Sequence, residues 1–130
     1  MNQHSVSEYT EDPLDAETMH LSFGNDVQFA CATMQIYLRD APGLALSVLQ
    51  AIREGDNEQL ATSAHALKGI TGYFTKKLFY RTCLELENLG RKNGLPTHSD
   101  YAFQTWSNLN ALLQDTLHSM QVFISVNEKQ

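Results

Sequence analysis

The sequence lacks the features of membrane, secreted and nucleic-acid-binding proteins. No apolar run approaches the roughly 20 residues that a membrane-spanning helix needs, and the first twelve residues are polar and acidic, unlike a signal peptide. The two cysteines, Cys31 and Cys83, form neither a disulfide framework nor a CxxC pair. Nine basic residues stand against 15 acidic ones, and the net charge of −6 provides no basic surface for nucleic acid. We therefore expect a cytoplasmic protein with reduced thiols.

Signals for β structure are also missing. The chain has no stretch of alternating β-branched residues, no Asn-Gly hairpin between strand-like runs and no internal repeat. Its 130 residues are enough for one domain with a real core and too few for two ordinary ones. The sequence therefore predicts a single all-α domain.

Residues that favour the starts and ends of helices divide the chain into six predicted helices. We expect helices over about 12–23, 26–38, 44–54, 57–73, 75–91 and 98–123, with a break or kink at Asp40-Ala41-Pro42. Asp56 and Gln59 have the spacing of a capping box. Short connections favour an antiparallel up-down four-helix bundle with a short additional N-terminal helix. The bundle is predicted over residues 12–124, with flexible tails at 1–11 and 125–130.

The predicted helix in the middle of the chain has two chemically different faces, at about 100° per residue. One face is expected to be core and consists of Leu60, Ser63, Leu67, Ile70 and Phe74. The other consists of Ala61, His65, Lys68, Gly69 and Gly72. It presents an imidazole, a cation one turn away and small residues, which suits a partner that approaches the imidazole closely and leaves an anion there.

Several short motifs together resemble the histidine-containing phosphotransfer (HPt) family. They are Ala64-His65-x-Leu67-Lys68-Gly69, Cys83-x-x-Leu86-Glu87 with Gly90, and the upstream Leu38-x-x-x-Pro42 and Gly55-Asp56. The resemblance covers roughly residues 13–124. It implies a four-helix bundle that takes a phosphoryl group from an aspartate of one receiver domain and passes it to another.

The resemblance also sets expectations for partners and cofactors. It implies response-regulator receiver domains and a hybrid sensor histidine kinase as partners, and a monomer. It implies no kinase activity, ATP site or cofactor in this domain, because the receiver supplies the Mg²⁺ site. No metal site is expected here.

Roles for individual residues follow from the wheel and the resemblance together. His65 is the expected phosphate carrier at Nε2, because a neutral imidazole is a good nucleophile at cellular pH. Lys68, on the same face, could pair with phosphoryl oxygens. Glu87, at the edge of the buried stripe of the following helix, could orient the other ring nitrogen. The small residues Ala61, Gly69 and Gly72 are the expected receiver-docking positions.

Two positions depart from the family pattern. Ile70 stands where the family usually has a small residue, and Thr75 where it often has Gly. Ile70 lies on the core side of the wheel and is interpreted as a packing variant. Thr75 is expected in the turn or at the N-cap of the next helix, where Thr is acceptable.

Three other functions are alternatives for a helical chain of this kind. A module that docks a receiver or kinase without carrying phosphate would need neither His65 nor Lys68. A metal-binding bundle predicts Glu-x-x-His pairs on facing helices, and the two carboxylate–histidine pairs with this spacing, Glu17 with His20 and Asp115 with His118, are too few. A self-contained enzyme would need a phosphate loop, nucleophile elbow or zinc motif, and none is present. The sequence leaves open the cognate kinase and receiver, the direction of phosphate flow, and whether the chain is part of a hybrid kinase.

Overall fold

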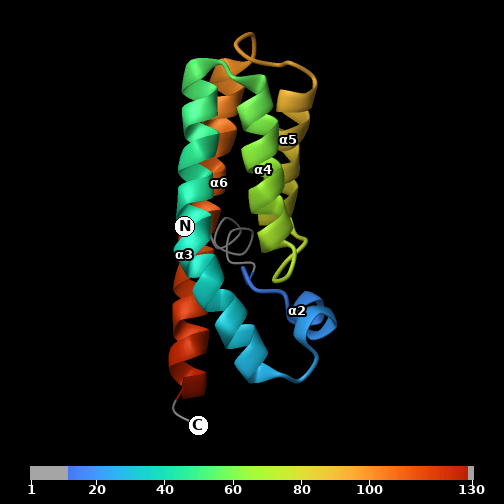
Figure 1. The fold of residues 1–130 in the computed structure, drawn as a ribbon, viewed down its shortest axis with the longest axis vertical. Coiled ribbons are helices and arrows are strands. Elements are labelled where there is room, and N and C mark those ends of the chain that lie inside the picture. The colour runs from blue at the N-terminus through green and yellow to red at the C-terminus, as the bar shows by residue number, and fades with distance from the viewer. Residues whose placement is uncertain (1–11, 129–130) are drawn as a thin grey trace, which may run out of the picture.

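The computed structural model describes residues 12–128, and this part of the chain is helical with no strand (Figure 1). The helices are α2 (Ala16–Phe23), α3 (Val27–Glu54), α4 (Asn57–Thr71), α5 (Leu78–Arg91) and α6 (Ser99–Glu128). The predicted fold class, a four-helix bundle with a short additional N-terminal helix, is confirmed.

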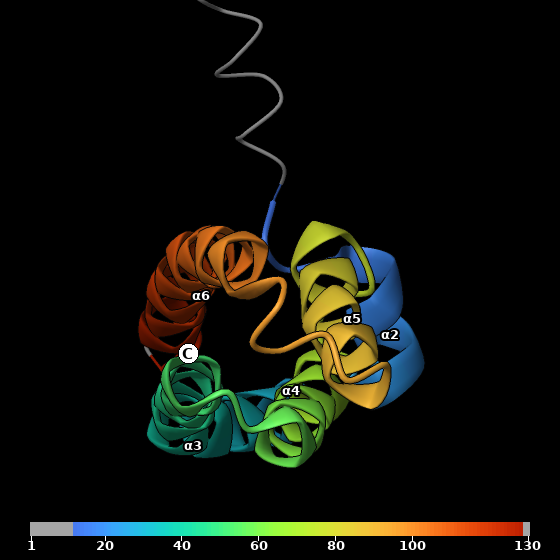
Figure 2. The ribbon, with the colours of Figure 1, turned by 90° about the horizontal axis from the view of Figure 1, so that it is seen from above.

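Helices α3 to α6 run alternately up and down and form a ring in which each packs against its chain neighbour and α6 closes on α3 (Figures 1 and 2). The ring is uneven, because α3 and α6 have 28 and 30 residues whereas α4 and α5 have 15 and 14. The long pair therefore extends past the short pair, and α2 lies beyond the lower end of α4 and packs on α3 (Figure 1).

Three aspartates fix the starts of the first three described helices. The side chains of Asp15, Asp26 and Asp56 accept hydrogen bonds from backbone N–H groups three residues further on, which satisfies donors that a helix start leaves free. The predicted capping box is only half formed. Gln59 does not reach back to Asp56 but donates from Nε2 to the carbonyl of Ser47 at 3.2 Å, tying α4 to α3.

The predicted division of residues 26–54 into two helices is wrong. Helix α3 is continuous through Pro42, although it changes direction along its length (Figure 1). A proline removes one backbone donor and crowds the preceding turn, which bends a helix. Buried Ala41 and Ala45 on either side pack in the core and keep the helix intact.

Other differences concern the ends and the helix faces. The last helix reaches Glu128, so the predicted tail is wrong for 125–128, while residues 1–11 and 129–130 lie outside the described part. Helix periodicity places Phe29, Leu78 and Phe103 on the apolar faces of their helices, yet they are 53%, 41% and 39% exposed. Each lies within two residues of a buried position. A small error in the predicted rotation of a helix about its axis is therefore enough to assign an exposed residue to the core.

Polar anchors cross the core between the helices. The buried hydroxyl of Tyr37 on α3 lies 2.9 Å from the hydroxyl of Thr71 at the end of α4, and burial raises the pKa of this phenol. Trp106 on α6 donates from Nε1 to the carbonyl of Ala45 on α3 at 2.8 Å. These bonds satisfy buried polar groups and fix how the helices are placed around the ring.

A histidine supported by a buried carboxylate

His65 lies near the middle of α4, on the face that the wheel predicted to be open. Its side chain is 60% exposed, whereas Leu60 and Leu67 on the opposite face are fully buried. Nδ1 lies 2.9 Å from Oε2 of Glu87 on α5, and Glu87 is only 3% exposed. The imidazole is therefore held from the protein side at one nitrogen and open to solvent at the other.

Glu87 is contacted by three basic side chains. Oε1 lies 2.7 Å from Nζ of Lys68, and Oε2 accepts from Nη2 and Nε of Arg91 at 2.6 and 3.0 Å. Burial by itself raises the pKa of this carboxyl group, but hydrogen bonds from Lys68, Arg91 and His65 outweigh it and lower the pKa to about 2. Glu87 is thus ionised across the whole physiological pH range.

The charge of Glu87 determines which nitrogen of His65 carries the proton. An ionised carboxylate can only accept hydrogen bonds, so Nδ1 must be the donor in the contact with Oε2. In the neutral ring Nε2 then has a free lone pair and faces outward. The arrangement leaves Nε2 as the ring nitrogen with an unshared lone pair.

The spacing between α4 and α5 depends on Gly90, one turn after Glu87. A Cβ atom at this position would lie 2.7 Å from the carbonyl oxygen of Asn57 and 2.8 Å from the backbone nitrogen of Ala61. These distances are shorter than any ordinary Cβ contact, so only glycine allows the two helices to approach this closely. The close approach places Glu87 within hydrogen-bonding reach of His65.

The three expected docking positions have different surroundings. Gly69 is exposed, and a Cβ atom built on it meets nothing within 4 Å. Gly72 is the C-cap of α4 and lies against the Tyr80 ring, where a Cβ atom would be 3.2 Å from Cε2. Ala61 is half-buried at the contact with Gly90. Gly69 is therefore the most open of the three, and the docking role of all three stays a prediction.

The departures from the family pattern lie away from His65. Ile70 is partly buried against the core, as expected for a packing variant. Thr75 is buried in the turn before α5, where its hydroxyl accepts from the N–H of Lys77, while the N-cap position belongs to Lys77. The side chain of Thr75 thus stabilises this turn.

Arg91 is the site residue that the sequence reasoning missed. It lies four residues after Glu87, which is the favourable spacing and order for a Glu–Arg pair on a helix. That spacing was a usable signal, but it is equally common on solvated helix surfaces. The structure distinguishes the two cases because Glu87 is buried while the side chain of Arg91 is 56% exposed.

Two kinds of feature are absent from residues 12–128. No helix there is long and apolar enough to cross a membrane. In the same residues no three His, Cys, Asp or Glu side chains are grouped so that they could hold a metal ion.

The fold and the site together define a class of protein. An antiparallel helical bundle that exposes one nitrogen of a carboxylate-oriented histidine is suited to carrying a group on that histidine. A family model, the Hpt domain, matches residues 32–121, and the chain belongs to this family. No curated protein and no solved structure matches the chain.

Membership gives the general role. Hpt domains carry phosphoryl groups on histidine in two-component phosphorelays and are not kinases themselves. They interact with receiver domains and kinases of these relays.

Proposed function

We propose that His65 accepts a phosphoryl group at Nε2 from a receiver-domain aspartate and passes it to the aspartate of a second receiver. The observation that carries this proposal is the contact between Nδ1 of His65 and the buried, ionised Glu87, together with the exposure of the ring. This contact leaves the attacking nitrogen unprotonated and directed toward a partner.

The transfer forms one bond and breaks another. The lone pair of Nε2 attacks phosphorus of the aspartyl phosphate, and the bond between phosphorus and the aspartate oxygen breaks, which returns the carboxylate to the receiver. Nδ1 keeps its proton and its hydrogen bond to Glu87, so the positive charge that develops on the ring faces a full negative charge. The second transfer is the reverse of the first, with a different receiver.

Lys68 stabilises the phosphorylated state in this proposal. Its ammonium lies 2.7 Å from Oε1 of Glu87 and sits on the same helix face as His65, three residues further on. Rotation of this flexible side chain brings the ammonium to the phosphoryl oxygens, while Arg91 remains on Oε2. Glu87 therefore remains paired with Arg91 when Lys68 moves to the phosphoryl group.

The receiver is proposed to dock over the C-terminal half of α4. Gly69 provides an open approach next to His65, and Tyr73 just beyond the helix is 52% exposed. The Tyr73 ring lies 6.4 Å from that of buried Phe23 at the end of α2, so Tyr73 joins the end of α4 to α2. A response-regulator receiver and the receiver of a hybrid kinase would use this surface in turn.

Phosphotransfer from a panel of radiolabelled, phosphorylated receivers tests the proposal. Wild-type protein is compared with His65→Gln and with the matched control His118→Gln, an exposed histidine on α6. Acid-labile, alkali-stable label on wild type and His118→Gln, but not on His65→Gln, is the expected result. Label that persists in a folded His65→Gln variant would overturn it. Docking without label on wild type, from any donor, would instead support a module that only binds receivers.

A further inference from the structure

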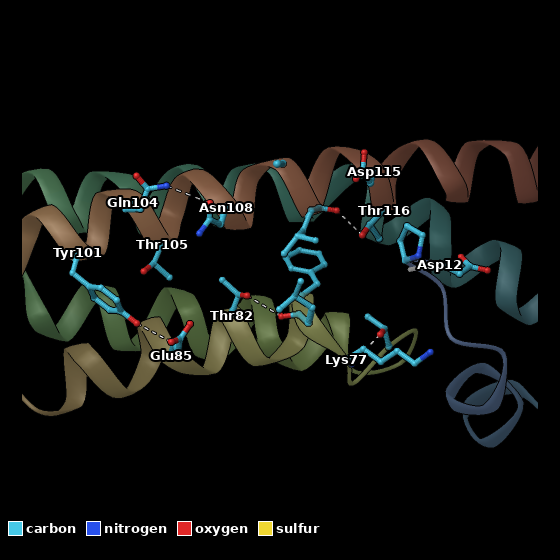
Figure 3. Close-up of a pocket in the computed structure, with 16 residues that line it drawn as sticks. Asp12, Lys77, Thr82, Glu85, Tyr101, Gln104, Thr105, Asn108, Asp115 and Thr116 are labelled. Atoms are coloured by element: carbon cyan, nitrogen blue, oxygen red, sulfur yellow. Dashed lines mark hydrogen bonds between the residues drawn. The ribbon is translucent and has the colours of Figure 1, made fainter. Parts of the chain in front are cut away.

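A cavity of about 630 Å³ lies between α5 and α6, away from the histidine site (Figure 3). None of His65, Lys68, Glu87 and Arg91 lines it. Its volume is within the range of small-molecule sites, about 300–1,000 Å³. The phosphotransfer mechanism makes no use of this space.

The cavity is elongated and has a carboxylate at each end. At one end the hydroxyl of Tyr101 on α6 donates to Glu85 on α5 at 2.7 Å, bridging the two helices (Figure 3). At the other end lie Asp12 and, on α6, Asp115 (Figure 3). Tyr101 and Asp115 are separated by about 21 Å along α6, at 1.5 Å per residue. The site is therefore long and narrow.

The lining between the two ends is weakly polar. Buried threonines from both helices contribute, among them Thr82, Thr105 and Thr116. The hydroxyls of Thr82 and Thr116 donate to carbonyls of their own helices. Their protons are therefore not available to a molecule in the cavity. Amide side chains of Gln104 and Asn108 complete the lining on α6 (Figure 3). Such a surface suits methylene groups alternating with a few polar ones.

The charge of the cavity selects a cationic occupant. Across residues 12–128, Asp12, Glu85 and Asp115 have no ion-pair partner, whereas Lys77 in the lining lies 3.5 Å from the carboxylate of Asp15. Residues 1–11, which lead into Asp12, contain two glutamates and neither lysine nor arginine. Their negative charge therefore disfavours this segment as the occupant of the acidic cavity. A second copy of the chain, with net charge −6, is repelled as well.

The dimensions select a thin occupant. An α-helix is about 10–12 Å wide with its side chains, so it could lie only across the rim of a site between two packed helices, whereas an extended chain can follow the site along its length. We propose that the α5–α6 cavity binds a linear alkyl polyamine, with terminal ammonium groups at Glu85 and Asp115 and methylenes along the threonines. This site is independent of the phosphotransfer proposal.

Titration of the full chain with spermine at physiological salt, followed by calorimetry and amide NMR, tests the proposal. We expect saturable binding with shifts centred on Thr82, Thr105 and Asn108. Because exposed ion pairs contribute up to about 1 kcal/mol each, Glu85→Gln and Asp115→Asn should each weaken binding up to about fivefold, and the double variant more. Asn108→Trp should block the cavity, because Asn108 lies at its exposed rim.

Matched controls separate this site from diffuse attraction to an acidic protein. Glu17→Gln with Glu58→Gln removes the same charge elsewhere, and Ser107→Trp adds the same bulk to an exposed position of α6 outside the cavity. These variants should bind spermine as wild type does. Equal weakening in cavity and control variants, no saturation at millimolar spermine, or equal competition by Mg²⁺ would overturn the proposal. So would a lysine-rich peptide that binds the cavity far more tightly, which would indicate a protein partner.

Discussion

Gly90 on α5 lies so close to Ala61 on α4 that a single added methyl group would collide with the Ala61 backbone. The separation of these two residues sets the distance over which Glu87 reaches His65. A position without a side chain thus controls the geometry of a site in which it takes no chemical part.

Gly90→Ala should therefore weaken both the fold and the transfer. The methyl group forces the helices apart, which overpacks a tight contact and should lower the free energy of unfolding by about 1–3 kcal/mol. Urea denaturation measures the first effect and the rate of phosphotransfer from a receiver the second. Gly43→Ala is the control, because a Cβ atom there meets nothing within 4 Å, and alanine should stabilise α3 by up to about 1 kcal/mol. Identical rates in Gly90→Ala and wild type would show that helix spacing does not control the site.

Glu87 should make the stability of the protein depend on pH in acid. Its pKa is lowered from 4.5 to about 2 on folding, so its ionised form stabilises the fold fully above about pH 5. That contribution, of order 3 kcal/mol, should be lost progressively as pH falls from about 5 to 2. The measurement is the urea midpoint of wild type and Glu87→Gln between pH 7 and pH 3. The wild-type advantage should be largest at pH 7 and shrink in acid; a constant difference would exclude the linkage.

Removing Lys68 should affect the phosphorylated protein more than removing Arg91. Lys68 shares the helix face of His65, whereas Arg91 lies on α5 and contacts Oε2 of Glu87, the same oxygen that Nδ1 of His65 contacts. Lys68→Ala should shorten the lifetime of the phosphohistidine or slow transfer about tenfold or more, since a charge-assisted contact is lost. Arg91→Gln should reduce the phosphohistidine lifetime and the transfer rate by a smaller factor. Decay of label on the isolated phosphoproteins gives both values. Equal lifetimes in wild type and Lys68→Ala would remove this lysine from the mechanism.

Gly69→Glu should prevent receiver docking while leaving the fold intact. The position is exposed and has free space around it, so the side chain can be accommodated, but it adds bulk and negative charge next to His65. Helical content by circular dichroism should match wild type, and receiver binding by calorimetry should be lost. Gly43→Glu places the same side chain on α3 and should bind normally. Unimpaired transfer by Gly69→Glu would locate the docking surface elsewhere.

The sequence was informative where local rules act alone. Asp56 and Gly55 mark a helix boundary through their own backbone preferences, and the open face around His65 follows from helix periodicity. The outcome at Pro42 could not be predicted in this way, because the choice between a break and a bend depends on packing across the core. The role of Arg91 depends on the burial of its partner, which is a tertiary property.

The shared carboxylate has an electrostatic consequence for partner recognition. Glu87 cancels only one of the two cations that contact it, so the site with a neutral His65 carries a single positive charge. A phosphoryl group on Nε2, with Nδ1 still protonated, places up to two negative charges on the phosphoryl oxygens and one positive charge on the ring, so the site becomes close to neutral near pH 7. Added salt should then weaken the encounter of the free carrier with an acidic partner surface more than it weakens that of the phosphorylated carrier. The charge of the site would thus differ between the free and the phosphorylated carrier, with no change in backbone shape.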